Sequence, residues 1–385
     1  MRPSRLAVAL AAILAAGLTL PAVAAPGKDG EQRPKHGNER DHDKRGHDKH
    51  HGPKDIPARD GCVGDPSSVI LLSYPSGGGT AEALYALPSH RPRGIVVFDH
   101  GYGHTMYSWA RHIQRTAQQL GVIAIAPDYR GQVNNLATQP LPSSRGWRVS
   151  AGAVDTNTVA QLFDSTCMKG RGHNVLYGVS MGGNTSGLAL AAKPKRTGNK
   201  PLWDEWVNVE GAANVLETYL GARALAPVNA FAKNAQEDIE QEMGGPPETA
   251  MQTYLDRSVV NRVDDIKASG VKGVVMVHGY ADGLVTHDIS RQLQLRLRAV
   301  GVPVDFTSFV THSAGSEPGT TLDGYLPTGQ TSPFAGHASE TSETHDVGRA
   351  GFRKLAELYH GMRHRCGERV VDGMTGQSQY VQGTC

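Results

Sequence analysis

The sequence predicts an α/β fold with a mostly parallel sheet of about eight strands and helices on both faces. From Cys62 onward, short runs rich in β-branched residues alternate with helical segments, and this alternation is typical of a parallel sheet covered on both sides. A stretch at about 213–262 breaks the alternation, because it contains only helical pieces, at Asn229–Met243 and Pro247–Asp256. It therefore predicts a helical cap insertion over the carboxyl edge of the sheet.

The individual elements follow from local composition. An opening strand pair is expected at Ser68–Tyr74 and Ala81–Leu87, around a Ser-Gly-Gly-Gly turn. Compact apolar runs predict the other strands at Gly94–Asp99, Val122–Ala126, Asn174–Gly178, Trp206–Val209, Val271–Val277 and Val302–Val310. Helices are expected at Met106–Leu120, Ala153–Asp164, Met181–Ala192, Ser290–Val300 and Val347–His360, the last of which would close the chain.

Residues 1–25 have the pattern of a signal peptide. Arg2 and Arg5 precede an apolar run at Leu6–Leu20, and Ala22-Val23-Ala24 offers a small-residue cleavage site. The run is short for a membrane span, and no other stretch is long and apolar enough to be one. We therefore expect a secreted, extracellular protein without a membrane span, whose main domain occupies residues 61–385.

Residues 26–60 are expected to be a disordered linker rich in charge and histidine. They have almost no apolar side chains to bury. Such a histidine-rich tract can bind transition metals loosely, but composition favours a spacer. Its histidines are His36, His42, His47, His50 and His51.

Charge and cysteine usage exclude several classes of function. The net charge of +2 does not favour binding to nucleic acid. None of the four cysteines stands in a CxxC pair, which argues against a zinc site, and export permits disulfides. We expect pairs between Cys62 and Cys167 and between Cys366 and Cys385.

The motif Gly178-Val179-Ser180-Met181-Gly182 lies where a strand is expected to end and a helix to begin. A serine at such a sharp turn has an exposed hydroxyl, and small neighbours let the strand and helix approach closely. The sequence therefore predicts Ser180 as a nucleophile. The loop His100–Gly103, after an earlier strand, would supply the second backbone N–H of an oxyanion hole, so the expected donors are the N–H groups of Tyr102 and Met181.

An acid partner is expected just past a later strand, where a carboxylate can orient an imidazole. Asp282, in the segment His278-Gly-Tyr-Ala-Asp282, fits this position best. Glu210 also ends a strand and is the alternative acid. Asp264 and Asp265 fall in an expected helix and are interpreted as solvated charges.

The ordered motifs HGYG, GVSMGG and HGYADGLV, with a late histidine, resemble the α/β-hydrolase superfamily. The chain is most similar to its dienelactone-hydrolase and prolyl-oligopeptidase-like branches, in which Asp128-Tyr129-Arg130-Gly131 also has a counterpart. This resemblance implies an α/β-hydrolase fold and a nucleophile–acid–histidine order. It extends over most of residues 70–360, although the segment 313–335 is longer than is usual there.

Three histidines compete for the role of general base. His337 is favoured because Gly336-His337 resembles the catalytic loop of the family and precedes the closing helix. His312 has the simplest topology, directly after the last strand. His345 lies at the expected start of the last helix, where the dipole disfavours an imidazolium.

The resemblance and the motifs predict a secreted serine hydrolase, a carboxylic ester hydrolase that acts through an acyl-enzyme. Its substrate would be a small-molecule or polymeric ester, with no cofactor and no metal. A secreted peptidase of the prolyl-oligopeptidase type is the alternative, disfavoured because no propeller domain fits before Cys62. A non-catalytic binding protein on the same scaffold is disfavoured because every triad position holds a competent residue.

Overall fold

The structure is a computed structural model that describes residues 62–316, 336–361 and 366–383. The expected signal peptide (1–25) and histidine-rich linker (26–60) lie outside the described residues, as does most of the segment 313–335.

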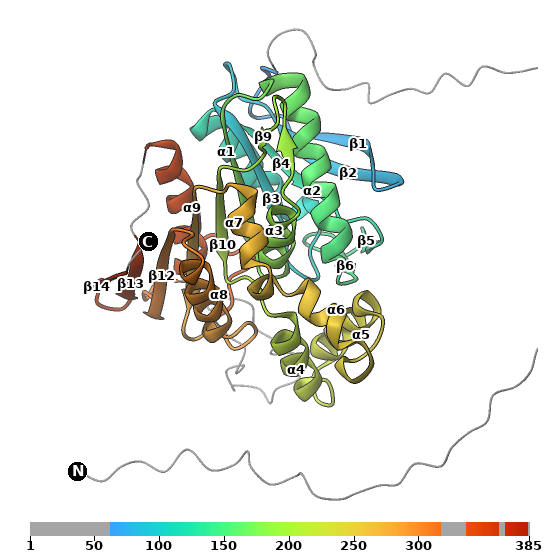
Figure 1. Cartoon of the computed structure of the whole chain (residues 1–385), viewed down its shortest axis with the longest axis vertical. Helices are drawn as coiled ribbons and strands as arrows, with labels where there is room; N and C mark the ends of the chain where they lie inside the picture. Colours follow the sequence, from blue (N-terminus) through green and yellow to red (C-terminus); the bar gives the residue numbers. More distant parts are fainter. Residues whose placement is uncertain (1–61, 317–335, 362–365, 384–385) are drawn as a thin grey trace, which may run out of the picture. The chain divides into compact units, whose positions relative to one another are not determined.

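A ten-stranded sheet forms the centre of the described part, in the order β1-β2-β4-β3-β7-β10-β11-β12-β13-β14 (Figure 1). Its strands are β1 (Ile70–Ser76), β2 (Gly79–Ala86), β3 (Gly94–Asp99), β4 (Ile123–Pro127), β7 (His173–Val179), β10 (Glu205–Val209), β11 (Gly273–Gly279), β12 (Val304–Thr311), β13 (Gly367–Asp372) and β14 (Ser378–Gln382). From β4 to β13 all neighbours pair in parallel, and only the edges are antiparallel. All eight expected strands are present, and the mostly parallel α/β sheet is confirmed.

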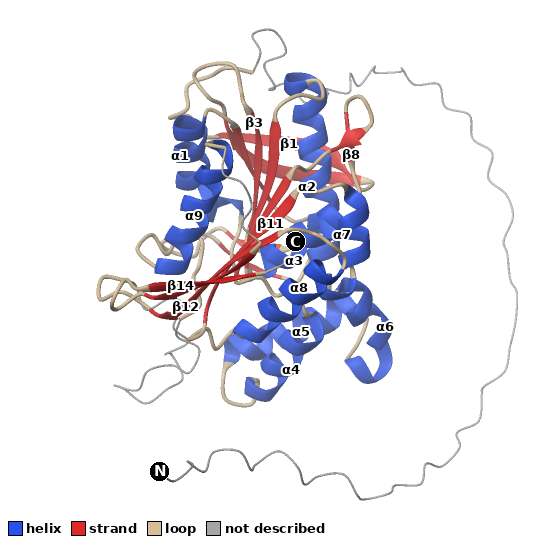
Figure 2. Cartoon of the chain, turned by 60° about the vertical axis from the view of Figure 1, so that its left-hand side comes forward, coloured by secondary structure: helices blue, strands red, loops and turns tan. Residues whose placement is uncertain are grey.

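Helices cover both faces of this sheet, as Figure 2 shows. One face carries α2 (Val149–Phe163), α3 (Met181–Ala191), α7 (Val263–Ser269) and α8 (His287–Ala299), and the other carries α1 (Ala110–Leu120) and α9 (Asp346–Tyr359). Side chains alternate along each buried strand, so β3 sends Ile95 and Val97 into one apolar core and Val96 and Phe98 into the other. Asp264 and Asp265 lie in α7, a helix as expected.

The chain does not end with a helix, which corrects the expectation for Val347–His360. After α9 it returns to the sheet edge as the antiparallel hairpin β13–β14. The residues of β14 are all exposed, and most of β13 is only half-buried. Edge strands of this kind have no run of apolar residues, so hydrophobic periodicity does not reveal them.

The cap consists of three helices that follow β10, namely α4 (Val215–Leu225), α5 (Ala230–Met243) and α6 (Pro247–Arg257). The sequence predicted α5 and α6, whereas α4 was not predicted. The side chains of Asn214 and Asn229 cap α4 and α5 by accepting hydrogen bonds from the backbone N–H groups of Glu217 and Ala232. Figure 1 shows these helices gathered at one end of the sheet. Since α4 leaves directly from the end of β10, that end is the carboxyl edge.

Cys62 and Cys167 form a disulfide, as the sequence predicted. Cys366 is also disulfide-bonded, and its expected partner, Cys385, lies outside the described residues. No helix in the described ranges is long and apolar enough to cross a membrane.

Candidate active site

Ser180 stands at a strained turn between β7 and α3. Its φ of 55° and ψ of −123° are unusual for a residue with a side chain. Both flanking glycines are required by space, because a Cβ on Gly178 would lie 2.2 Å from the carbonyl oxygen of Gly182, and one on Gly182 would lie 2.1 Å from that of Asp99. The local sequence thus permits a turn that places the hydroxyl at the carboxyl edge of the sheet, directly before the N-terminus of α3.

The loop after β3 passes beside Ser180. A Cβ built on Gly101 would lie 3.3 Å from the Cβ of Ser180, so the backbone leading into Tyr102 is adjacent to the serine. The structure therefore brings together the two segments that carry the expected oxyanion donors, Tyr102 in this loop and Met181 in the first turn of α3.

Cap helix α5 holds Tyr102 in place. The Tyr102 hydroxyl donates to Asp238 Oδ2 at 2.6 Å, and the same carboxylate accepts from Arg145 Nε at 2.8 Å. The Tyr102 ring also packs against Trp147 and Phe231. Sequence reasoning missed Asp238 and Arg145, because they are distant in the chain and only the folded cap joins them to this loop.

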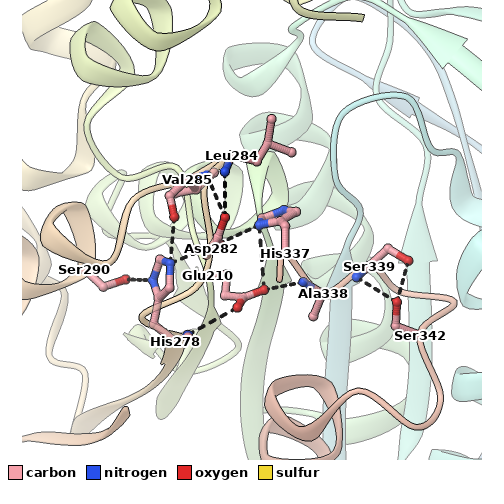
Figure 3. Close-up of polar contacts among 11 residues, drawn as sticks. Glu210, His278, Asp282, Leu284, Val285, Ser290, His337, Ala338, Ser339 and Ser342 are labelled. Atoms are coloured by element: carbon pink, nitrogen blue, oxygen red, sulfur yellow. Dashed lines mark hydrogen bonds and ion pairs between the residues drawn. The ribbon is translucent and has the colours of Figure 1, made fainter. Parts of the chain in front are cut away.

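Asp282 and His337 form a close buried pair, drawn in Figure 3. His337 Nδ1 lies 2.7 Å from Asp282 Oδ2. The other oxygen, Oδ1, accepts from the backbone N–H groups of Leu284 and Val285, both at 2.9 Å. Since Nδ1 is engaged by the carboxylate, Nε2 is the nitrogen of His337 that remains for proton exchange with a serine hydroxyl.

The charges of this pair shift both pKa values. Burial by itself raises the pKa of Asp282, but the adjacent His337 and His278 outweigh it and hold that pKa well below its usual range. Burial by itself lowers the pKa of His337, but the charge of Asp282 and its hydrogen bond outweigh burial and raise the pKa to about 9. Asp282 is thus an anion that stabilises an imidazolium, which is what a triad acid must do.

A second imidazole lies on the far side of Asp282. His278 Nε2 is 3.1 Å from Asp282 Oδ2 and 2.8 Å from the carbonyl oxygen of Val285, while its Nδ1 is 2.6 Å from Ser290 Oγ (Figure 3). The acceptor at Val285 fixes Nε2 as the protonated nitrogen. His278 is fully buried and therefore helps to orient Asp282 without reaching the cavity.

Glu210 adjoins the pair without being its main partner. Its Oε2 lies 3.7 Å from His337 Nδ1, longer than the 2.7 Å contact of Asp282. Burial, followed by the nearby charge of Asp282, raises the pKa of Glu210 to about 7. Of the two acids that the sequence left open, Asp282 has the geometry of a histidine partner.

The other two candidate histidines have no hydrogen bond to the acids of the site. His345 is the N-terminal cap of α9 and is fully buried, and its ring centroid lies 4.7 Å from that of His312. Neither ring has a hydrogen-bond partner among the described residues. Burial lowers the pKa of both, that of His345 to about 4. His312 Nδ1 lies 3.9 Å from Asp346 Oδ2, which is too long for a hydrogen bond like the 2.7 Å contact that orients His337.

Ser180 and His337 line the same cavity, which has a volume of about 100 Å³. Most of its wall is apolar and comes from the cap and the surrounding loops. The residues that form it are Thr218, Gly221, Ala222, Leu225, Phe231, Ala232, Ala235, Tyr102, Trp147, Leu284, Val285 and Ala338.

Glu340 also lines the cavity and is buried. Its carboxylate accepts from the N–H of Gly101 and lies 3.5 Å from His104 Nε2. Glu340 was not predicted as a site residue, although it stands three residues after His337.

Glu210, Asp282 and His337 place one potential metal ligand each within 4.8 Å of one another. These atoms already have partners, however. Both oxygens of Glu210 accept from backbone N–H groups, and Asp282 accepts from two N–H groups and lies against two imidazoles. The donor set therefore fits proton transfer through His337 better than the binding of a cation.

Comparison with known proteins identifies the family to which the chain belongs. A model of the alpha/beta hydrolase family matches residues 96–303, more than half of the chain. No curated protein matches it by sequence. Similar solved structures include a puromycin hydrolase, at 16% identity and a TM-score of 0.50, and an acylaminoacyl peptidase of Pyrococcus horikoshii, at 15% and 0.51. Each match covers 77% of this chain, but only 40% of the first protein and 42% of the second. A carboxyl esterase 2 of Tuber melanosporum matches at 15% identity and a TM-score of 0.49, over 77% of this chain and 87% of that one.

Proposed function

Because the chain belongs to the α/β-hydrolase family, we propose that it is a secreted serine hydrolase that cleaves carboxylic esters through an acyl-enzyme on Ser180. The observation that carries the proposal is the buried Asp282–His337 pair, with its 2.7 Å contact, in the wall of the same cavity as the strained Ser180. A serine, a histidine and a carboxylate are the parts that nucleophilic acyl transfer needs.

In the proposed mechanism, Ser180 Oγ attacks the ester carbonyl carbon while its proton passes to His337 Nε2. Asp282 stabilises the resulting imidazolium through Nδ1. The tetrahedral intermediate collapses as the carbon–oxygen bond to the alcohol breaks, and the imidazolium gives its proton to the departing alkoxide. Water then attacks the acyl-enzyme with the same histidine as base, which releases the acid and regenerates Ser180.

The oxyanion formed in both steps needs preorganised donors. We assign these to the backbone N–H groups of Tyr102 and Met181. The support is the passage of the Gly101 backbone beside Ser180 and the position of Met181 in the first turn of α3, where N–H groups have no partner within the helix. The contacts of Tyr102 with Asp238 and Trp147 would keep this loop in one conformation.

The cavity favours a substrate with a small apolar group next to the reacting carbonyl. Its volume of about 100 Å³ is below the roughly 150 Å³ of an engineered core cavity that holds benzene. Glycine and alanine residues of α4 and α5 form much of the wall, with Gly221, Ala222 and Ala235 among them. Short-chain acyl esters are therefore the proposed substrate class.

Secretion is proposed from the signal-peptide pattern of residues 1–25. A Cys62–Cys167 disulfide is consistent with an oxidising compartment, where such bonds persist. N-terminal sequencing of protein recovered from the medium tests this, and a product that still begins at Met1 would contradict it.

A panel of p-nitrophenyl esters of increasing acyl length, set beside a proline-containing anilide, tests the function. We expect turnover of the short esters and little cleavage of the anilide. Faster cleavage of the anilide would favour a peptidase of the prolyl-oligopeptidase type. No turnover of either, in a folded protein, would favour a binding protein on the same scaffold.

A further inference from the structure

Glu210 has a backbone conformation and a set of contacts that the proposed mechanism does not use. Its φ of 49° lies in the left-handed region, which residues with a side chain rarely adopt. Its side chain is fully buried at the end of β10. A strained, buried carboxylate persists only where the surrounding structure holds it, and such residues concentrate at functional sites.

The two oxygens of Glu210 bind two different loops. Oε1 accepts from the N–H of Gly279 at 3.3 Å, at the start of the loop that carries Asp282. Oε2 accepts from the N–H of Ala338 at 2.6 Å, the residue directly after His337 (Figure 3). One carboxylate therefore ties the loop of the acid to the loop of the histidine, although the two are far apart in the sequence.

We propose that Glu210 is a positioning residue, which bridges the Asp282 and His337 loops and adds a second negative charge beside the imidazole of His337. This inference rests on the proposed function, since it assigns Glu210 a part in the same reaction. Glu210 does not line the cavity, so it acts through His337 and not through contact with substrate.

The charge of Glu210 acts in the same direction as that of Asp282. The two carboxylates lie 3.7 Å and 2.7 Å from His337 Nδ1, and both stabilise the imidazolium. Burial and the charge of Asp282 raise the pKa of Glu210, while the N–H groups of Gly279 and Ala338 donate to its two oxygens and stabilise the carboxylate. Charged or titratable groups face Glu210 from the neighbouring strands and loops, namely Asp282, His278, His337, His312 and Tyr177.

Two variants separate the charge from the bridge. Glu210→Gln keeps the shape and one acceptor oxygen, but it loses the charge and turns an amide NH₂ toward one of the two N–H donors. Glu210→Asp keeps the charge but is one methylene too short to reach both loops. Glu248→Gln is the matched control, because Glu248 is an exposed cap carboxylate paired with Arg223, outside the cavity.

For Glu210→Gln we expect kcat for p-nitrophenyl butyrate to fall about 100-fold with KM unchanged, because a misplaced base lowers turnover without altering binding. The acid limb of its kcat/KM profile should move to lower pH by about one unit, since loss of the negative charge lowers the pKa of His337. For Glu210→Asp we expect a similar fall in kcat with the limb near its wild-type position. Glu248→Gln should match the wild type.

NMR titration of the His337 ring in ¹⁵N-histidine-labelled protein gives the same pKa without any substrate. A lower His337 pKa in Glu210→Gln would support the charge effect even in a protein that cleaves no ester. Absence of ester cleavage would count against the proposed function alone. Wild-type kcat in both variants would overturn the inference. So would a loss of kcat in Glu210→Gln that comes with an unchanged His337 pKa, because Glu210 would then have only a structural part.

Discussion

At the scale of single residues, the site depends on how completely Asp282 is held. Its carboxylate accepts from the backbone of Leu284 and Val285 and lies against the rings of His278 and His337. Both oxygens of the Asp282 carboxylate thus have hydrogen-bond partners, which fixes the orientation of His337 before substrate arrives.

Sequence patterns pointed to Ser180, Asp282 and His337, because strand ends and glycines mark them. They did not reveal His278 or Glu340 as members of the site, since their contacts exist only after folding.

Alanine replacements of the three candidate histidines should differ sharply. His337→Ala should lower kcat for p-nitrophenyl butyrate by about 10⁴-fold, because the serine loses its base. His312→Ala and His345→Ala should change kcat by about tenfold or less, which corresponds to about 1.4 kcal/mol of barrier. Initial rates of the three purified variants provide the measurement. Near-wild-type activity in His337→Ala, with a large loss in either of the others, would move the base to that histidine.

The pH profile should reflect the negative charges around His337. A general base works only in its neutral form, so kcat/KM falls as the pH drops through the pKa of the histidine. Since Asp282 raises that pKa to about 9, the acid limb should lie well above the ordinary value of about 6.5. Steady-state rates between pH 5 and 10 measure this. A limb at or below 6.5 would contradict the raised pKa.

At the scale of elements, the sequence predicted the sheet better than the parts attached to it. The inner strands are runs of buried β-branched residues, so their pattern is strong, as in β11, where every residue is buried. The hairpin β13–β14 and helix α4 escaped prediction for a common reason. Neither contains a long buried stretch, and α4 buries only Val215 and Tyr219. The wall of the cavity, to which α4 contributes, could not be predicted either.

Gly221 of α4 allows a direct test of the cap as the wall of the substrate cavity. A Cβ at this position would meet nothing within 4 Å, and Gly221 lines the cavity. Gly221→Phe should therefore raise KM for longer acyl esters by about tenfold or more, while turnover of the acetyl ester changes little, because the added ring excludes acyl methylenes worth about 1–3 kcal/mol each. Gly221→Ala is the matched control, expected to leave specificity unchanged and to stabilise the helix by about 1 kcal/mol. Equal effects of Gly221→Phe on short and long esters would contradict this role.

At the scale of the whole described domain, the Cys62–Cys167 disulfide joins its first described residue to the segment after α2, across 105 residues of chain. Closing so long a loop restricts the unfolded chain strongly. Cys62 is also buried against the same core as α2, so the bond fixes the entry of the chain onto the sheet.

Replacing both Cys62 and Cys167 by serine should lower the free energy of unfolding by about 3–5 kcal/mol. Urea titration of the variant and the wild type, each under oxidising and reducing conditions, measures the difference. Reduction should destabilise the wild type more than the variant. Equal midpoints for wild type and variant under oxidising conditions would contradict a stabilising role for this disulfide.

The central claim is that Ser180 is the nucleophile, and covalent labelling tests it most directly. A fluorophosphonate reacts with a serine only when a neighbouring base activates it. We expect the wild-type protein to take up one equivalent of the label, mapped by peptide mass spectrometry to Ser180, and we expect Ser180→Ala to remain folded and unlabelled. Label that persists in Ser180→Ala, or that maps to another residue of the wild type, would contradict the account.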